Sequence, residues 1–97
     1  MTSTPTAVRL VGAADATKLA DAGYRILDVR EPVEWNAGHI PGATLLPLAD
    51  VPDRIAEVVP QLDTPLLVLC AVGARSARAA AYLAGIGYTD IVNMHAS

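Results

Sequence analysis

The chain has 97 residues, enough for one domain, with a formal charge of −3 at pH 7 and a single cysteine. The acidic balance, with no basic stripe, argues against nucleic acid as a partner. The lone cysteine excludes an internal disulfide and favours a reducing, cytoplasmic location. The longest apolar runs, such as residues 66–72, are far too short to cross a membrane, so no membrane partner is expected.

Five short apolar segments alternate with helical patterns along the chain. We expect strands at Val8–Val11, Arg25–Val29, Thr44–Leu46, Leu66–Leu69 and Asp90–Asn93. The second and fourth lack a polar alternation, which is typical of strands buried on both faces. The predicted fold class is therefore α/β, with three layers: helices flank both sides of a central, mostly parallel, five-stranded sheet.

Two helices are expected between the earlier strands. The segment Ala13–Ala22 has helical apolar spacing, and Gly23 follows it as a C-terminal cap. A second helix opens at residues 50–53, where a proline and two acidic residues favour a helix start, and it ends at Pro60.

The last helix is expected over Ser76–Ile86, with Gly87 as its cap. Ser76 can either cap the start of this helix or donate weakly to the preceding loop, and we favour the cap. Alanines at helical spacing are expected to face the sheet and to allow a close approach; they are Ala77, Ala80, Ala81 and Ala84.

Cys70 stands where the fourth strand leads into this helix. The backbone amides of a tight loop and the N-terminus of a helix both favour a negative charge there. Arg75 adds a fixed positive charge, and Gly73 permits the backbone conformation that such a loop needs. These groups would lower the pKa of the thiol below its ordinary value of about 8.5. We interpret Cys70 as an accessible nucleophile; the alternative is an inert cysteine buried at the end of a strand.

The other chemically capable residues are interpreted as structural. Asp28, Arg30 and Glu34 follow or end the second strand, and such charges need one another as partners. His39 invites comparison with a cysteine–histidine pair, but its glycine- and proline-containing flanks favour a rigid turn. His95 has no informative context. One cysteine and two scattered histidines lack metal-ligand spacing, so we expect no metal and no other cofactor.

Two parts of the chain resemble the rhodanese family of sulfurtransferases. The matching segments follow the family's order and together span most of residues 26–94. They are 28–32 (DVREP), 34–35 (EW), 38–43 (GHIPGA), 70–76 (CAVGARS) and 85–88 (GIGY).

The resemblance implies a single rhodanese-like domain over residues 1–97, in which Cys70 carries a sulfane sulfur as a persulfide. The donor would be thiosulfate or a persulfide, and a loop with one charged residue suits a neutral persulfide equally well. With no second cysteine, the acceptor must be cyanide, an external thiol or a partner protein. The loop that would bind the donor and stabilise the sulfur anion comprises Ala71, Val72, Gly73, Ala74 and Arg75.

Two other functions stay open. Phosphatases and arsenate reductases of the same fold share the cysteine, the loop and the arginine, but their loop is one residue longer than the four residues that separate Cys70 from Arg75. The second alternative is a non-catalytic rhodanese-like module that binds a partner or senses oxidation.

Members of the family usually continue past the last strand with a paired glycine and a tryptophan-bearing helix, whereas this sequence stops at Ser97. We therefore expect the closing segment to be short or missing. A parallel sheet needs cover on both faces, so an open face would promote self-association or be covered by a partner.

Overall fold

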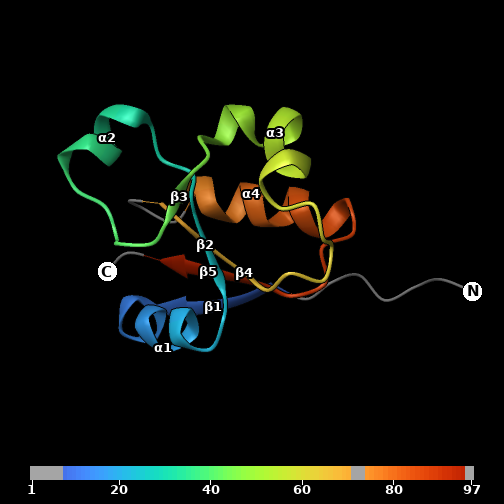
Figure 1. Ribbon diagram of the computed structural model, residues 1–97, viewed down its shortest axis with the longest axis horizontal. Coiled ribbons are helices and arrows are strands. Elements are labelled where there is room, and N and C mark those ends of the chain that lie inside the picture. The colour runs from blue at the N-terminus through green and yellow to red at the C-terminus, as the bar shows by residue number, and fades with distance from the viewer. Residues whose placement is uncertain (1–7, 71–73, 96–97) are drawn as a thin grey trace, which may run out of the picture.

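A computed structural model describes residues 8–70 and 74–95 of the chain (Figure 1). The five strands are β1 (Val8–Gly12), β2 (Arg25–Asp28), β3 (Thr44–Leu45), β4 (Leu66–Leu69) and β5 (Ile91–His95). The helices are α1 (Ala16–Asp21), α2 (Pro32–Ala37), α3 (Val51–Val58) and α4 (Ala74–Gly85), with short 3-10 turns at η1 (Ala13–Asp15) and η2 (Leu48–Asp50). Every predicted strand is present: β4 has the predicted bounds, and each of the others differs by one or two residues at an end.

The sheet has the order β1-β5-β4-β2-β3, and all of its pairings are parallel. Helices α3 and α4 lie on one face and α1 lies on the other (Figure 1). The predicted three-layer α/β class is thereby confirmed. From β2 the chain moves outward to β3, whereas from β4 it moves the opposite way to β5. A parallel sheet forms a crevice where successive connections diverge in this manner, at the carboxyl ends of the strands.

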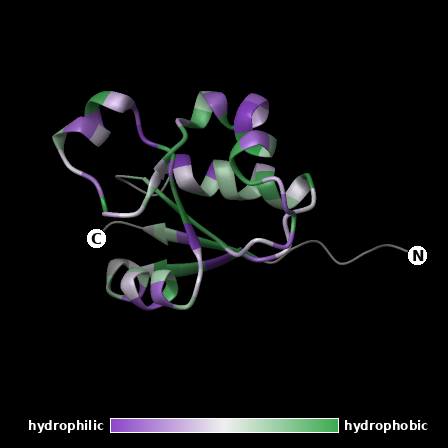
Figure 2. Ribbon diagram, in the orientation of Figure 1, coloured by the Kyte–Doolittle hydropathy of each residue, from purple (hydrophilic) through white to green (hydrophobic). Residues whose placement is uncertain are grey.

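Side chains of the central strands alternate between two apolar clusters, one on each face of the sheet. Leu27 and Val68 point to the cluster under α3 and α4, which also contains Leu83. Ile26 and Leu67 point to the smaller cluster under α1. Figure 2 shows these strands as apolar segments in the interior. Burial on both faces explains why β2 and β4 show no polar alternation in the sequence.

The prediction for the buried face of α4 was right for Ala80, which is fully buried, and wrong for Ala77 and Ala81. Ala77 and Ala81 are exposed, and Ala84 is half-buried. The buried residues are Ser76, Ala79, Ala80 and Leu83. Leu83 is the largest apolar side chain in this part of the helix, and burying it stabilises the fold more than burying an alanine methyl group would. The helix is therefore rotated so that Leu83 reaches the core.

The exposed apolar part of the sheet lies on its edge strand. In β1, Leu10 is 65% exposed and Val8 is 38% exposed. Val8 pairs with Ile91, whose side chain belongs to the cluster under α4. Leu10 is two positions further along the strand, so Val8 and Leu10 share the face of the sheet that α4 covers only in part. Self-association through this face stays a prediction. Within the described residues, no helix combines the length and apolar character needed to cross a membrane.

Gly87 ends α4 as predicted, in a backbone conformation that favours glycine. Its φ is +111°, its amide donates to the carbonyl of Ala84 at 3.3 Å, and the amide of Tyr88 donates to the carbonyl of Leu83 at 3.1 Å. This pair of hydrogen bonds satisfies carbonyls that the helix leaves open at its end. A Cβ at position 87 would lie 3.4 Å from Leu62 Cδ1, in ordinary contact, so φ is the decisive constraint.

Two glycines at the end of α4 provide a matched pair of substitutions. Gly87→Ala is expected to lower the free energy of unfolding by at least about 1 kcal/mol, because a side chain disfavours the left-handed region. Gly85→Ala is expected to raise it by about 0.5–1 kcal/mol, since Gly85 is helical and no atom lies within 4 Å of its added Cβ. Urea unfolding of both variants measures the two effects, and changes of the same sign would contradict this assignment.

Candidate active site

The candidate site lies at the carboxyl ends of β2, β4 and β5. Strand register places Asp28 beside Leu69 and Leu69 beside Met94, so the three residues form one row across the sheet. The segments that follow β2 and β4 carry Arg30 and Cys70, respectively. Because these connections leave in opposite directions, residues far apart in the sequence meet above this row.

Cys70 is held against the first turn of α4. The backbone amide of Ser76 donates to Cys70 Sγ at 3.2 Å, and Ser76 Oγ lies 3.4 Å from the same sulfur. Both residues are buried, with Cys70 only 1% exposed. The sulfur is therefore less accessible than the sequence led us to expect, although Cys70 still lines the pocket described below.

Ser76 is not the helix cap that the sequence analysis favoured. Helix α4 begins at Ala74, so Ser76 lies within its first turn and its hydroxyl is directed to the cysteine. A serine hydroxyl can accept from a thiol and can donate to a thiolate. Together with the amide of the same residue, it provides two donors to a sulfur anion at the N-terminus of a helix, where negative charge is favoured.

Asp28 and Arg30 form a nearly buried ion pair. Arg30 Nε donates to Asp28 Oδ1 at 2.9 Å and a terminal nitrogen of Arg30 donates to Oδ2 at 2.8 Å. The same terminal nitrogen donates to the carbonyl of Gly38 at 2.8 Å. The Asp28 side chain is fully buried and that of Arg30 is 17% exposed. The hydrogen bonds to Asp28 raise the pKa of Arg30.

Glu34 and Arg75 form a second ion pair, in bidentate geometry. The two terminal nitrogens of Arg75 donate to the two oxygens of Glu34 at 2.6 and 2.8 Å. Glu34 Oε1 also accepts from the amide of Glu31 at 2.9 Å, a bond that closes the start of α2. The hydrogen bonds from Arg75 lower the pKa of Glu34 from 4.5 to about 2, and the same contact raises the pKa of Arg75.

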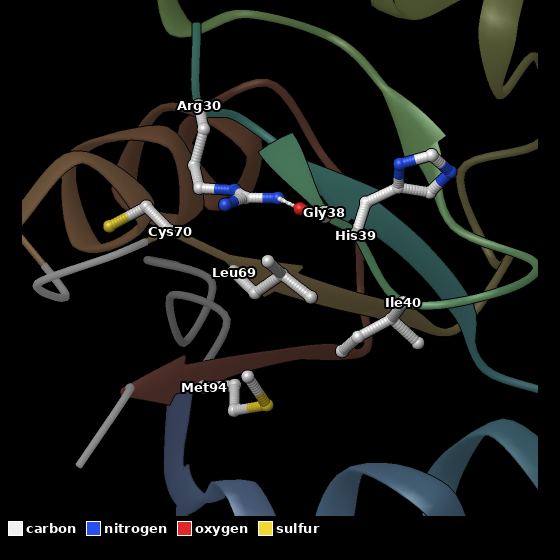
Figure 3. A pocket seen from close by; sticks show the side chains of 7 residues that line it. All are labelled: Arg30, Gly38, His39, Ile40, Leu69, Cys70 and Met94. Carbon is white, nitrogen blue, oxygen red and sulfur yellow. Dashed lines mark hydrogen bonds between the residues drawn. The ribbon is translucent and has the colours of Figure 1, made fainter. Parts of the chain in front are cut away.

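His39 lies at the rim of the site but not next to the sulfur. Its ring stacks on Trp35, with 3.5 Å between the ring centroids, and its Nδ1 is 3.0 Å from the Trp35 carbonyl oxygen. Figure 3 shows the imidazole turned away from Cys70. This arrangement does not provide the hydrogen-bonded cysteine–histidine pair of a thiol protease.

A pocket opens beside Cys70, above the row of strand ends (Figure 3). The residues that line it are Arg30, Gly38, His39, Ile40, Leu69, Cys70 and Met94. Leu69 and Met94 come from the last positions of β4 and β5, and Ile40 comes from the turn between α2 and β3. The structure thus brings an apolar surface to the candidate nucleophile.

The predicted loop is covered only in part by the described residues. Ala71, Val72 and Gly73 lie outside them. Ala74 is exposed at the start of α4, and Arg75 is half-buried in its pair with Glu34. Among the described residues, no three His, Cys, Asp or Glu side chains are grouped so that they could hold a metal ion.

Sequence reasoning missed three features of this site. The first is the contact of Ser76 with the sulfur, which its position three residues into α4 produces. The second is the pairing of Glu34 with Arg75, which no local pattern indicates. The hydrogen bond between Glu34 and the amide of Glu31 did have a signal in the sequence, because Glu34 lies three residues after Glu31 and Pro32 favours a helix start. The third is the apolar wall, whose residues come from separate strands and a turn.

The Glu34–Arg75 pair is expected to stabilise the fold in a pH-dependent way. In the unfolded chain Glu34 takes up a proton near its ordinary pKa of 4.5, whereas in the folded protein it does so near about 2. The stabilisation is thus complete above the first value and is lost as the pH falls toward the second.

Urea unfolding of the wild type and of Glu34→Gln across this range measures the effect. The difference in free energy of unfolding is expected to be constant above about pH 5 and to shrink on acidification. Glu57→Gln is the matched control, because Glu57 is 69% exposed and lies 3.9 Å from its partner Arg54. A difference that does not vary with pH would contradict the assignment.

Removal of the Ser76 hydroxyl is expected to destabilise the thiolate. Ser76→Ala deletes one donor, worth about 1 kcal/mol, so the pH midpoint for alkylation of the lone cysteine by iodoacetamide is expected to rise by about 0.7 unit. The midpoint is the relevant readout because altered access changes the rate equally at every pH. Ala77→Ser, at the next and exposed position, is expected to leave the midpoint unchanged, and equal midpoints in wild type and Ser76→Ala would contradict the role of the hydroxyl.

Comparisons of sequence and of structure both match this chain to rhodanese-type proteins. The family model for the rhodanese-like domain matches residues 13–97. The chain is 40% identical over 79 residues to thiosulfate sulfurtransferase GlpE of Pseudomonas entomophila (strain L48). The aligned region covers 81% of this chain and 71% of that protein. It is 37% identical over 67 residues to thiosulfate sulfurtransferase PspE of Escherichia coli (strain K12), covering 69% of this chain and 64% of the relative. A solved structure described as rhodanese with anions from E. coli is similar with a TM-score of 0.72 and 34% identity, over 75% of this chain and 86% of that chain.

Proposed function

Because this chain belongs to the rhodanese-like domain family, we propose that it is a thiosulfate or persulfide sulfurtransferase with Cys70 as its nucleophile. The observation that carries the proposal is the position of its lone cysteine. Cys70 directly follows the central strand β4, the amide of Ser76 donates to its sulfur, and the residue forms part of a pocket wall. Two relatives, of which this chain covers 71% and 64%, are named thiosulfate sulfurtransferases.

In the first half-reaction the Cys70 thiolate attacks the outer sulfur of thiosulfate. A bond forms between the two sulfur atoms while the sulfur–sulfur bond of thiosulfate breaks, and its electron pair leaves with sulfite. The amide and hydroxyl of Ser76 stabilise the thiolate before the attack. The backbone of residues 71–75 is proposed to stabilise the persulfide in the same way.

In the second half-reaction an acceptor attacks the outer sulfur of the Cys70 persulfide. With cyanide the products are thiocyanate and the free thiolate, so the enzyme returns to its starting state. The chain has one cysteine and cannot resolve the persulfide by itself. The acceptor is therefore an external thiol, cyanide or a partner protein, and the kinetics are expected to be ping-pong.

The roles of the neighbouring charges follow from their partners. Asp28 and Arg30 hold the turn at Gly38 and so shape one side of the pocket, while Glu34 holds Arg75 against α2. These residues, like His39, are positioning residues in this proposal. With its two terminal nitrogens already bound to Glu34, Arg75 is poorly placed to hold a phosphate, which favours sulfur transfer over the phosphatase alternative.

The remaining assignments belong to the same proposal. Residues 1–97 are taken as one rhodanese-like domain that works without a metal or other cofactor. The lone cysteine favours a reducing compartment, and we assign the protein to the cytoplasm.

Mass spectrometry of the intact protein tests the function. Treatment with thiosulfate is expected to add one sulfur atom to Cys70, and cyanide is expected to remove it with release of thiocyanate. Cys70→Ser is expected to reduce this transfer to the uncatalysed level, because the variant lacks the sulfur nucleophile. Hydrolysis of an aryl phosphate without sulfur transfer would instead establish the phosphatase alternative. The absence of both activities would favour the non-catalytic binding module.

A further inference from the structure

A groove separate from the pocket beside Cys70 lies between α3 and α4, the two helices on one face of the sheet (Figure 1). Its volume is about 180 Å³. The residues that line it are Leu48, Val51, Pro52, Arg78, Ala79 and Tyr82. Val51 and Ala79 are buried, whereas Pro52, Arg78 and Tyr82 are exposed. The groove therefore has an apolar floor and an accessible rim, and it shares no lining residue with the pocket beside Cys70.

The α4 side of the groove carries a row of exposed side chains. Arg78 and Tyr82 are four residues apart in the helix and so stand on the same side of it. Ile86 continues this row, because its amide still donates to the carbonyl of Tyr82 at 3.1 Å. Tyr82 is 39% exposed and Ile86 is 42% exposed. An aromatic ring, an arginine and an aliphatic side chain gathered beside a groove are typical of a protein-binding surface.

Arg78 gives this groove a positive charge that the protein itself does not neutralise. In the part of the chain that the structure describes, no carboxylate forms an ion pair with its guanidinium. Asp50 and Asp53, the acidic residues next to the groove in sequence, are not among the residues that line it. Arg30 and Arg75, in contrast, are both bound by carboxylates. Arg78 can thus bind a carboxylate of another molecule without breaking a contact within the protein.

The size of the groove favours a side chain over a metabolite as its occupant. Pockets that bury a drug-sized molecule measure about 300–1,000 Å³, well above the volume of this groove. One apolar side chain of a polypeptide is small enough to enter, while the rest of that polypeptide covers the exposed row on α4. Tyrosine and arginine are also among the residues that contribute most to binding between proteins.

We propose that the groove between α3 and α4 binds an acidic segment of a partner protein. One apolar side chain of that segment would cover Val51 and Ala79, and a neighbouring carboxylate would bind Arg78. The inference goes beyond the proposed function and stands apart from it, because the binding requires neither Cys70 nor the pocket beside it.

The groove lies at the same end of the sheet as the candidate active site. The amide of Leu48 donates to the carbonyl of Val29 at 3.2 Å, and the amide of Val29 donates to the carbonyl of Leu69 at 3.0 Å. Cys70 directly follows Leu69. A partner held in the groove is therefore on the side of the molecule where Cys70 leaves β4, which a protein acceptor of its sulfur must approach.

Short peptides test the binding with the intact protein. The probe is acetyl-Gly-Asp-Leu-Asp-Gly-amide; a neutral form has Asn in place of both Asp, and a third form has Ala in place of Leu. Amide shifts in proton–nitrogen correlation spectra report the affinity and the location, which is expected at Val51, Ala79 and Tyr82. The neutral form is expected to bind about threefold more weakly, as for exposed ion pairs. The alanine form is expected to bind about tenfold more weakly, because it buries less apolar area.

Two variants separate the charge from the apolar contact. Arg78→Gln is expected to remove the preference for the acidic peptide, and Arg25→Gln is its matched control, because Arg25 is exposed at the start of β2 and outside the groove. Tyr82→Ser is expected to weaken the acidic and neutral peptides equally, by about fivefold. Its control is Val33→Ser, because Val33 is 75% exposed on α2 and outside the groove. All four side chains are exposed, so the variants are expected to fold.

The outcomes distinguish this occupant from others. Equal affinities for the acidic and neutral peptides, or a preference that persists in Arg78→Gln, would overturn the acidic partner. Shifts confined to Leu69 and Met94 would place the peptide in the pocket beside Cys70 and overturn the groove as its site. Shifts at the groove that depend on protein concentration without peptide would overturn the proposal in favour of a second copy of this chain. Sulfur transfer to Cys70 is measured separately, so failure of the peptides to bind leaves the proposed function unaffected.

Discussion

The ion pair between Glu34 and Arg75 joins two segments that are 41 residues apart in the chain. Glu34 belongs to α2, which leads from the end of β2 to β3, and Arg75 belongs to the first turn of α4, which follows Cys70. The amide of Glu31 binds the same carboxylate, so the pair also fixes the start of α2. The pocket lies next to these two segments, because Gly38, His39 and Ile40 follow α2 and Cys70 precedes α4.

The Glu34–Arg75 ion pair determines how readily the Arg75 guanidinium can bind an anionic substrate. Breaking a buried or half-buried ion pair leaves an uncompensated charge, so arginines held in this way are poor at exchanging their partner for a substrate. In this molecule the amide and the hydroxyl of Ser76 lie within hydrogen-bonding distance of the sulfur, and the Arg75 guanidinium interacts with Cys70 electrostatically. Preorganised neutral donors at a helix N-terminus thus act together with a nearby cation to stabilise a sulfur anion.

The packing of α4 on the sheet and the chemistry of the site are coupled through one face of that helix. Ser76, Ala79, Ala80 and Leu83 are buried at helical spacing. Burial of Leu83 in the core sets the rotation of the helix, and the same rotation turns Ser76 to Cys70. The core thus positions a donor at the sulfur, while the small residues between them keep the helix close to β4.

The sequence by itself determined the α/β class, the five strands, the role of Gly87 as the cap of the last helix and the identity of Cys70 as the candidate nucleophile. These features are local: apolar runs, glycine at a helix end, and a cysteine between a strand and a helix are each visible in a few adjacent residues. Only the tertiary structure decided that Arg75 binds Glu34, that Ser76 faces the sulfur, and that Cys70 is covered. Those contacts depend on strand order and on the rotation of α4, which are set by long-range packing that no short stretch of sequence encodes.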